Sequence, residues 1–309
     1  MNPSMFDGYT RQNPSSDKET MHDRISDFHI AILSHILSYI PTLDAVHTCV
    51  LSKGWRNIWR SVPSLSFDQY LTKKDFLEFI DNVISSHDGS TIDKFHLSTL
   101  YSTDSLTNLI GKCIDFVVRR NVQFIDLKLP LCDSLPPSIF TCESLKHLKL
   151  FSTSNIFGPA RRFQQPYWIY LPKLETLHLI RVGFYDVESL ISSCPILENL
   201  ILVTCMDSDL RNFMLSALCL KTLYLENVAF SDDQSIESLF SSCLLLEALI
   251  LKNCSYSKVK KFTISAPRLK DLSFQHSNDK ILEFPQEAAV ITISAPALTS
   301  FQLFVYSLP

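Results

Sequence analysis

Glycine is scarce in this chain, and its scarcity narrows the possible functions. The 309 residues include only 6 glycines, so there is little material for the glycine-rich loops that cradle phosphate groups. The sequence lacks the GxGxxG, GxxxxGK[ST], HExxH and GxSxG motifs, and no spacing pairs a nucleophile with a base. We therefore predict a protein that is not an enzyme and that holds no cofactor or metal.

Other absences bear on the compartment and the partners. The net charge of −4 gives no electrostatic case for nucleic acid. No apolar run reaches the ~20 residues of a membrane span, and the amino terminus lacks a signal-peptide pattern. The 9 cysteines show no CxxC spacing, which favours reduced thiols. We therefore expect a protein of the cytoplasm or nucleus, with no membrane and no nucleic acid among its partners.

The back half of the chain instead repeats one apolar pattern, Leu-x-x-Leu-x-Leu-x-x-(Cys or Asn). Copies begin at Phe124, Leu145, Leu174, Leu197, Leu220, Leu246, Leu269 and Leu298. Cysteine stands at the ninth position three times, as Cys132, Cys205 and Cys254. This spacing is typical of leucine-rich repeats, each of which contributes one short strand to a stacked core. The predicted fold class is α/β: a solenoid with a curved parallel sheet and with helices or turns on its convex side.

Residues 68–123 show two helical patterns next to short apolar stretches. One helical face carries Phe76, Phe79, Ile80, Val83 and Ile84, and the next carries Leu106, Leu109, Ile110, Cys113, Ile114 and Val117. These patterns predict two divergent β–α repeats at the start of the solenoid. The sequence TISAP, at 263–267 and again at 292–296, supports the repeat register. The predicted divisions are a disordered tail over 1–20, a helical module over 21–67, divergent repeats over 68–123 and leucine-rich repeats over 124–309.

Strand side chains alternate in direction. If the leucines at the fourth and sixth positions point into the core, the third, fifth and seventh positions lie on the concave face. In the middle repeats these positions are unusually apolar, and an exposed apolar strip marks a partner site. The alternative is that a loop or a neighbouring segment covers the strip. The predicted target-binding residues are Phe151, His178, Ile180, Ile201, Val203, Tyr224 and Ile250.

Residues 21–67 predict a bundle of three short helices. Apolar residues at helical spacing begin at Phe28, the first helix ends before Pro41, and Thr42 is predicted to cap the second. The segment carries more large apolar residues than so small a bundle can bury. The surplus indicates a docking surface for another protein, and packing against the chain's own repeats is the alternative.

The helical module resembles a plant F-box. The matching motifs are DRIS at 23–26, ILSHIL at 32–37, PT at 41–42, DAV at 44–46, VLSK at 50–53 and WRNIW at 55–59. The repeats, with TISAP-type starts and SSCP-type loops, resemble the plant F-box/leucine-rich-repeat group of the FBD type. Together the two similarities span nearly the whole chain after the tail.

This resemblance implies a substrate-recognition subunit of a Skp–cullin–F-box ubiquitin ligase. The F-box docks a Skp-family adaptor and through it a cullin, the repeats hold a target protein, and partners transfer the ubiquitin. Carried over onto this sequence, the adaptor-facing positions are Phe28, Ile32, Leu33, Ile36, Leu37, Val46, Val50, Trp55 and Trp59.

The sequence departs from the family pattern in the F-box. Residues 28–31 read FHIA where the family usually reads LPDE, and Gly54 stands where a basic residue usually precedes the first tryptophan. One alternative is therefore an interaction scaffold with a degenerate F-box that no longer binds the adaptor. Another is a receptor that depends on a small ligand held by the apolar strip with His147, Lys149 and His178.

The end of the chain follows directly on a repeat pattern. No capping repeat is evident before Pro309, and members of the group often carry a further carboxy-terminal domain. Because solenoid ends normally need a cap, we expect either a truncated chain or an exposed last strand.

Overall fold

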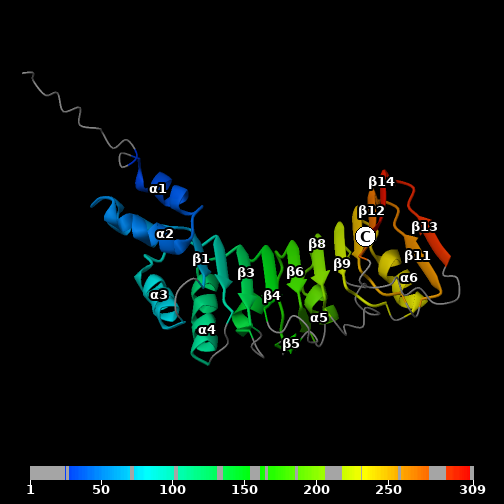
Figure 1. Cartoon of the computed structure of the whole chain (residues 1–309), viewed down its shortest axis with the longest axis horizontal. Helices are drawn as coiled ribbons and strands as arrows, with labels where there is room; N and C mark the ends of the chain where they lie inside the picture. The colour runs from blue at the N-terminus through cyan, green and yellow to red at the C-terminus, as the bar shows by residue number, and fades with distance from the viewer. Residues whose placement is uncertain are drawn as a thin grey trace, which may run out of the picture.

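A curved stack of strands with a helical module at its amino-terminal end forms the molecule (Figure 1). A computed structural model describes residues 25, 28–69, 73–100, 104–130, 135–153, 161–163, 166–184, 187–205, 218–230, 232–256, 259–277 and 290–306. The predicted tail over 1–20, and Cys132, lie outside these residues. Within the described ranges, no helix combines the length and the apolar character that crossing a bilayer requires.

Among the residues that the structure describes, the main sheet has 10 strands, and neighbouring strands run parallel. Along β4, β6, β8, β9 and β10, half-buried residues alternate with fully buried ones. This alternation confirms the predicted solenoid. The strands, in sheet order, are β1 (Ser64–Asp68), β2 (Lys94–Ser98), β3 (Phe124–Leu129), β4 (His147–Ser152), β6 (Thr176–Ile180), β8 (Asn199–Val203), β9 (Thr222–Glu226), β10 (Ala248–Lys252), β12 (Asp271–Ser277) and β14 (Ser300–Tyr306).

The sheet corrects the register of one predicted copy. Phe124, predicted as a first position, pairs with His147, which is a third position. That copy therefore begins at Val122, whose side chain is buried. Side-chain direction in a strand has a period of two, so this even shift leaves the inward and outward sides unchanged. Asp126 and Lys128 accordingly remain on the outward side, as predicted.

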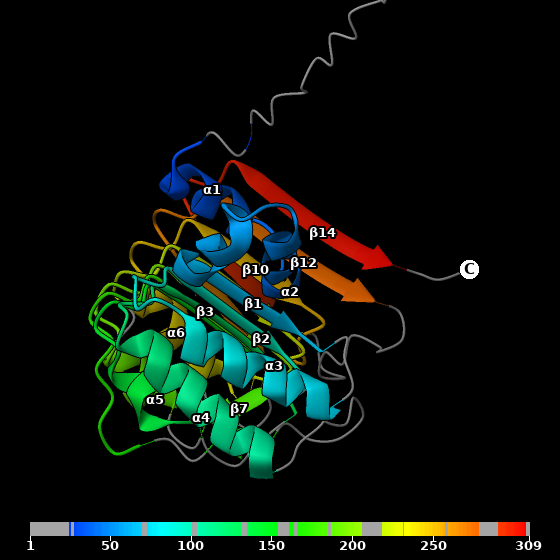
Figure 2. The ribbon, with the colours of Figure 1, turned by 90° about the vertical axis from the view of Figure 1, so that its left-hand side faces the viewer.

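The helices lie on the outer side of the arc (Figures 1 and 2). They are α3 (Lys73–Ser86), α4 (Asp104–Val118), the short 3₁₀ helix η3 (Pro137–Thr141), α5 (Val187–Ser192) and α6 (Asp233–Ser242). Short parallel strands pair on the same side, β5 (Arg161–Phe163) with β7 (Val182–Phe184) and β11 (Lys261–Ser265) with β13 (Val290–Ser294). The two TISAP copies meet in register, since Thr263 pairs with Thr292.

The strand ends of the middle repeats share a backbone turn, and in two of them a buried thiol follows the turn. The eighth position has a positive φ in consecutive copies, at Arg181 (57°), Thr204 (52°), Asn227 (54°) and Asn253 (50°). The thiol of Cys205 then donates to the carbonyl of Leu179 at 3.2 Å, and Cys254 donates to Leu225 at 3.5 Å. Each bond satisfies a carbonyl of the preceding repeat, which gives the ninth-position cysteines a structural role. Burial raises the pKa of both thiols to about 11.

The amino-terminal module contains α1 (Ile30–Leu37), α2 (Thr42–His47) and the 3₁₀ helices η1 (Thr48–Val50) and η2 (Trp55–Ser61). Its core consists of Leu33, Leu37, Ala45, Trp55, Ile58 and Val62. Thr42 does not form the predicted side-chain cap of α2. Its hydroxyl instead accepts a hydrogen bond from Ser66 N at 2.7 Å. Because Ser66 lies in β1, this bond ties the module to the sheet, which already begins inside the predicted module range 21–67.

Candidate binding surfaces

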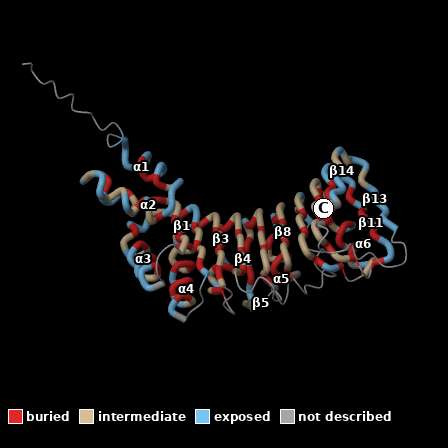
Figure 3. The backbone as a smooth tube through the Cα atoms, in the orientation of Figure 1, coloured by how far each residue is buried: buried red, intermediate tan, exposed pale blue. Residues whose placement is uncertain are grey.

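The outer surface of the helical module carries exposed apolar side chains. Of the predicted adaptor-facing residues, Phe28, Ile32 and Ile36 are 49%, 48% and 44% exposed, and Val50 is 83% exposed. Because the module has a separate buried core, these side chains are not needed to hold its helices together. They form an unpartnered apolar surface at one end of the arc, where Figure 3 shows the exposed outer turns of α1.

Other predicted adaptor-facing residues lie inside the module. Leu33, Leu37 and Trp55 are nearly fully buried, because their positions on α1 and η2 face the common core. We therefore assign them a structural role in place of adaptor contact. Val46 and Trp59 are half-buried, and the Arg60 guanidinium stacks 5.6 Å from the Trp59 ring centroid.

The FHIA departure has a local structural counterpart. The first turn of α1 contains no acidic residue, and His29 occupies the N-cap position. Its Nδ1 atom accepts a hydrogen bond from Ala31 N at 3.3 Å. An imidazole thus satisfies one of the free amides at the start of the helix, a role usually taken by an oxygen-bearing side chain. The departure alters the chemistry of this surface but leaves α1 formed.

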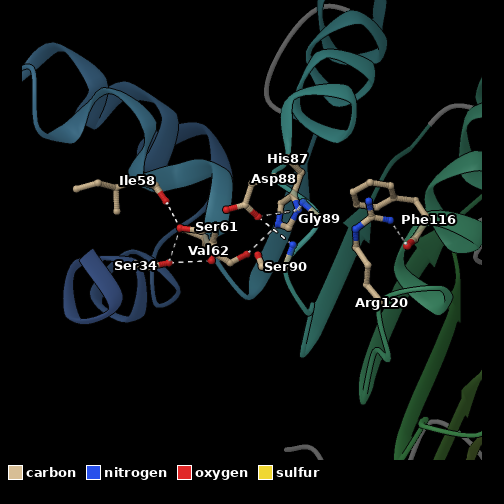
Figure 4. A network of polar contacts seen from close by, with 10 residues as sticks. All are labelled: Ser34, Ile58, Ser61, Val62, His87, Asp88, Gly89, Ser90, Phe116 and Arg120. Atoms are coloured by element: carbon tan, nitrogen blue, oxygen red, sulfur yellow. Dashed lines mark hydrogen bonds and ion pairs between the residues drawn. The ribbon is translucent and has the colours of Figure 1, made fainter. Parts of the chain in front are cut away.

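A polar network joins the module to the first repeats (Figure 4). Ser34 Oγ donates to Ser61 O at 2.9 Å within the module. From the repeats, Asp88 N donates to Arg60 O at 3.0 Å, and His87 Nε2 lies 3.4 Å from Val62 O. Burial lowers the pKa of His87. These bonds connect the end of η2 to the end of α3, so the module is anchored to the solenoid beside its apolar outer surface.

The second surface is the concave face of the middle repeats. Strand pairing places Phe151, Ile180 and Val203 side by side in one row, because Phe151 pairs with Ile180 and Ile180 pairs with Val203. The next row contains His178, Ile201, Tyr224 and Ile250, again in register. All seven predicted target-binding residues are half-buried. The structure therefore brings them together as one patch on the inner side of the arc, which we call the concave apolar patch.

Charged residues continue the second row beyond His178. Asp68 Oδ1 lies 3.2 Å from His96 Nε2, and Asp126 Oδ2 lies 3.3 Å from His96 Nδ1. Lys149 Nζ lies 3.8 Å from the same Asp126 oxygen. The hydrogen bond to Asp126 raises the pKa of His96, with a further contribution from Asp68. Burial alone would raise the pKa of Asp126, but the His96 hydrogen bond and the Lys149 charge lower it.

The carboxy-terminal border of the concave apolar patch is also internally paired. The Tyr224 hydroxyl donates to Glu226 Oε2 at 2.6 Å, and Lys252 Nζ lies 3.0 Å from Glu226 Oε1. Burial and this carboxylate raise the pKa of Tyr224 well above its usual range. The sequence alone does not reveal these pairings, because each joins neighbouring side chains on one face of the sheet.

The trio His147, Lys149 and His178, predicted to help hold a small ligand, does not form one cationic cluster. Lys149 is directed toward Asp126, and the His147 ring lies tilted by 40° to the Phe124 ring, with the ring centroids 5.7 Å apart. Burial and the Lys149 charge lower the pKa of His178, which favours its neutral form. In the described part of the chain, no group of three or more His, Cys, Asp or Glu side chains has an arrangement that could hold a metal ion.

A further apolar groove lies near β14. Phe301 and Leu303, at inward positions of β14, are exposed, and with Phe274 and Ile293 they line a space of about 250 Å³. Equivalent rows are buried in the earlier repeats. The groove is therefore an exposed continuation of the solenoid core, and it lies apart from the concave apolar patch.

Comparison with known proteins identifies both regions. Residues 25–67 match the family model of the F-box domain. Residues 115–217 match the model described as FBD-associated F-box protein At5g56370, LRR repeats. Residues 219–244 match the leucine-rich-repeat model. The chain thus contains an F-box followed by leucine-rich repeats, and the resemblance to plant F-box/leucine-rich-repeat proteins is confirmed.

Curated relatives in Arabidopsis thaliana share this organisation by name. F-box/LRR-repeat protein 13 is 37% identical over 194 residues, covering 58% of this chain and 40% of the relative. F-box/FBD/LRR-repeat protein At1g78750 is 35% identical over 197 residues, covering 58% and 41%. Putative FBD-associated F-box protein At1g55030 is 30% identical over 218 residues, covering 69% and 50%. The chain spans two fifths to one half of the length of these relatives.

Proposed function

We propose that this chain is a substrate-recognition subunit of a Skp–cullin–F-box ubiquitin ligase. The F-box docks a Skp-family adaptor and through it a cullin, and the leucine-rich repeats bind the target protein. The chain works by proximity, because it raises the effective concentration of the target near the catalytic partners. It performs no chemistry of its own, and we expect it to work in the cytoplasm or nucleus.

The observation that carries the proposal is the separation of core and surface in the F-box. Phe28, Ile32, Ile36 and Val50 remain exposed although the module is already anchored to the repeats. These apolar side chains therefore stay exposed even though the module packs against the chain's own solenoid. A helix that presents apolar side chains at this spacing suits a partner with a hydrophobic groove.

The proposal is tested by calorimetric titration of the full chain with purified Skp-family adaptors. Ile36→Asp places a charge in the apolar surface and is expected to weaken binding at least about tenfold, or ~1.4 kcal/mol. Ile196→Asp is the matched control, because Ile196 is 42% exposed, close to the 44% of Ile36, but lies in the repeats. Equal affinities of the two variants, or no binding by the wild-type chain, would contradict the proposed role as a ubiquitin-ligase subunit.

A scaffold with a degenerate F-box is the second candidate. The imidazole cap at His29 and the absence of acids in the first turn of α1 favour it. The titration separates the two, since the scaffold predicts no adaptor binding by a chain that is otherwise folded. Restoring the family pattern at 28–31 by replacing FHIA with LPDE should then create adaptor affinity. The ligand-dependent receptor is less favoured, because Lys149 already pairs with Asp126, His147 contacts Phe124, and the pKa of His178 is lowered by burial.

A further inference from the structure

The charged residues that border the concave apolar patch differ in whether they already have an ion-pair partner. On its carboxy-terminal side, Glu226 is held by Tyr224 and Lys252. On its amino-terminal side, Asp126 is held by His96 and Lys149. Both carboxylates therefore already have counter-charges, and a cationic partner gains little from either of them.

Lys128 is the exception in this border. It stands in the same row as the patch, because Lys128 pairs with Phe151 and Phe151 pairs with Ile180. Among the described residues, Lys128 forms no direct ion pair, although its charge helps to lower the pKa of Asp126 on the same strand. Within the described part of the chain, a lysine without an ion-paired carboxylate thus occupies the strand position next to the half-buried Phe151.

The local charge balance also favours an anion on this side. When His96 is protonated, the cations His96, Lys128 and Lys149 face the carboxylates Asp68 and Asp126. The excess is one positive charge, and it falls at Lys128 because the other groups neutralise one another. A half-buried apolar patch next to a cation without an ion-pair partner is complementary to a ligand that joins an acidic group to an apolar one.

The spacing of the strands fixes the separation of those two groups. Neighbouring strands lie about 4.8 Å apart, and Lys128 and Ile180 are on β3 and β6, with only β4 between them. The separation across the sheet is therefore about 10 Å. An extended chain in the polyproline II conformation advances ~3.1 Å per residue and returns to the same side every third residue. A segment that lies across the strands can thus place an acidic side chain and, three residues on, a bulky aliphatic side chain on the same face.

We propose that the concave face binds an extended target segment of the type acid-x-x-aliphatic, with the acidic side chain on Lys128 and the aliphatic side chain on Ile180 and Val203. The inference rests on the proposed function for its biological role, and it adds the chemistry of the target. Specificity comes from two contacts made by one segment, one with the Lys128 charge and one with the apolar side chains. An acidic segment that lacks the aliphatic residue does not cover the patch.

Selection of a random displayed peptide library on the immobilised full chain tests this inference. Enriched peptides should share an acidic residue three positions from a bulky aliphatic one. Their affinity should fall at least about tenfold for Lys128→Glu, and less for Lys128→Gln, which removes the charge without reversing it. Replacing the acidic residue of the peptide by lysine should recover binding to Lys128→Glu. Lys173→Glu is the control, because Lys173 is exposed in the turn before β6.

Several outcomes overturn the inference. These are enrichment of basic peptides, apolar peptides whose affinity is indifferent to Lys128, or no enrichment by a chain whose circular dichroism shows it to be folded. Equal losses for Lys128→Glu and Lys173→Glu also contradict it, since they indicate only a general charge effect. Adaptor titration of the same variants separates this inference from the proposed function. A chain that binds the adaptor but selects no such peptide refutes the target chemistry alone.

Discussion

Two neighbouring aliphatic residues on β8 test the division between core and binding surface. Leu202 points inward, is 2% exposed and pairs in register with Leu179 and Leu225. Ile201 belongs to the concave apolar patch and is half-buried. Leu202→Ala removes buried atoms and leaves a cavity, which typically costs ~2–5 kcal/mol. Ile201→Ala removes partly hydrated atoms and should cost less than about 1 kcal/mol.

Urea unfolding of the full chain, followed by far-ultraviolet circular dichroism, gives the two free energies of unfolding. The difference between the variants should be at least about 1 kcal/mol. Because each repeat is coupled to its neighbours, the slope of the transition must be compared as well, and an unchanged slope shows that cooperativity is preserved. Equal costs, or a larger cost for Ile201→Ala, would refute the assignment of the two faces and with it the binding patch.

The remaining predictions concern titration, backbone and thiols. Burial lowers the pKa of His87 below its ordinary 6.5. The neutral imidazole therefore stabilises the fold fully above pH 6.5, and this stability is lost as the pH falls. His87→Gln should remove this loss of stability at acid pH from pH-dependent thermal melts. The pKa of His96 is raised above 6.5, so its contribution is present below pH 6.5 and is lost as the pH rises, and His96→Gln should flatten the alkaline side of the same curve. Thr204 is a β-branched residue at φ 52°, and its Oγ1 accepts a hydrogen bond from Asn227 Nδ2 at 3.1 Å. Thr204→Gly relieves the backbone strain but loses this bond, so the free energy of unfolding should change by less than about 1 kcal/mol, and a loss of more than about 2 kcal/mol in denaturant titration would contradict this balance. A thiol reagent should label the half-buried Cys49 in the native chain but should label the buried Cys254 only after unfolding. Rapid labelling of Cys254 in the native chain would contradict its packing.

Periodicity predicted the repeat domain well because the determining interactions are local and repeated. The leucines at the fourth and sixth positions are buried in copy after copy, as at Leu177 and Leu179. The register of the Val122 copy was missed because Phe124, Leu127 and Leu129 also match the apolar pattern. Only strand pairing with β4 distinguishes the two registers, and pairing is a long-range property.

The F-box shows a second feature that sequence patterns do not predict, namely which apolar side chains face the core. Helical spacing identified Leu33 and Ile36 as apolar positions of one helix, but spacing does not say which side meets the core. Packing of α1 against η2 decides it, burying Leu33 and leaving Ile36 exposed. In the same way, the hydroxyl of Thr42 bonds to β1, a strand that propensity near Thr42 does not reveal.

The polar part of the concave face was the least predictable. The residues Asp68, His96, Asp126 and Lys149 are dispersed along the sequence and meet only because four strands align. No sequence pattern marks Lys128 as a charge without an ion-pair partner, because its availability depends on how its neighbours pair. Tertiary register therefore determines the chemistry of the site, even where the repeat pattern determines the fold.

Hydrogen exchange of the full chain, with and without a purified Skp-family adaptor, tests the central claim most directly. The account predicts slower exchange in α1, η1 and η2 upon adaptor binding, and unchanged exchange in β6, β8 and β9, which would leave the concave face free for a target. Protection of the concave strands with no change in α1, or no protection anywhere, would contradict the assignment of adaptor docking to the F-box.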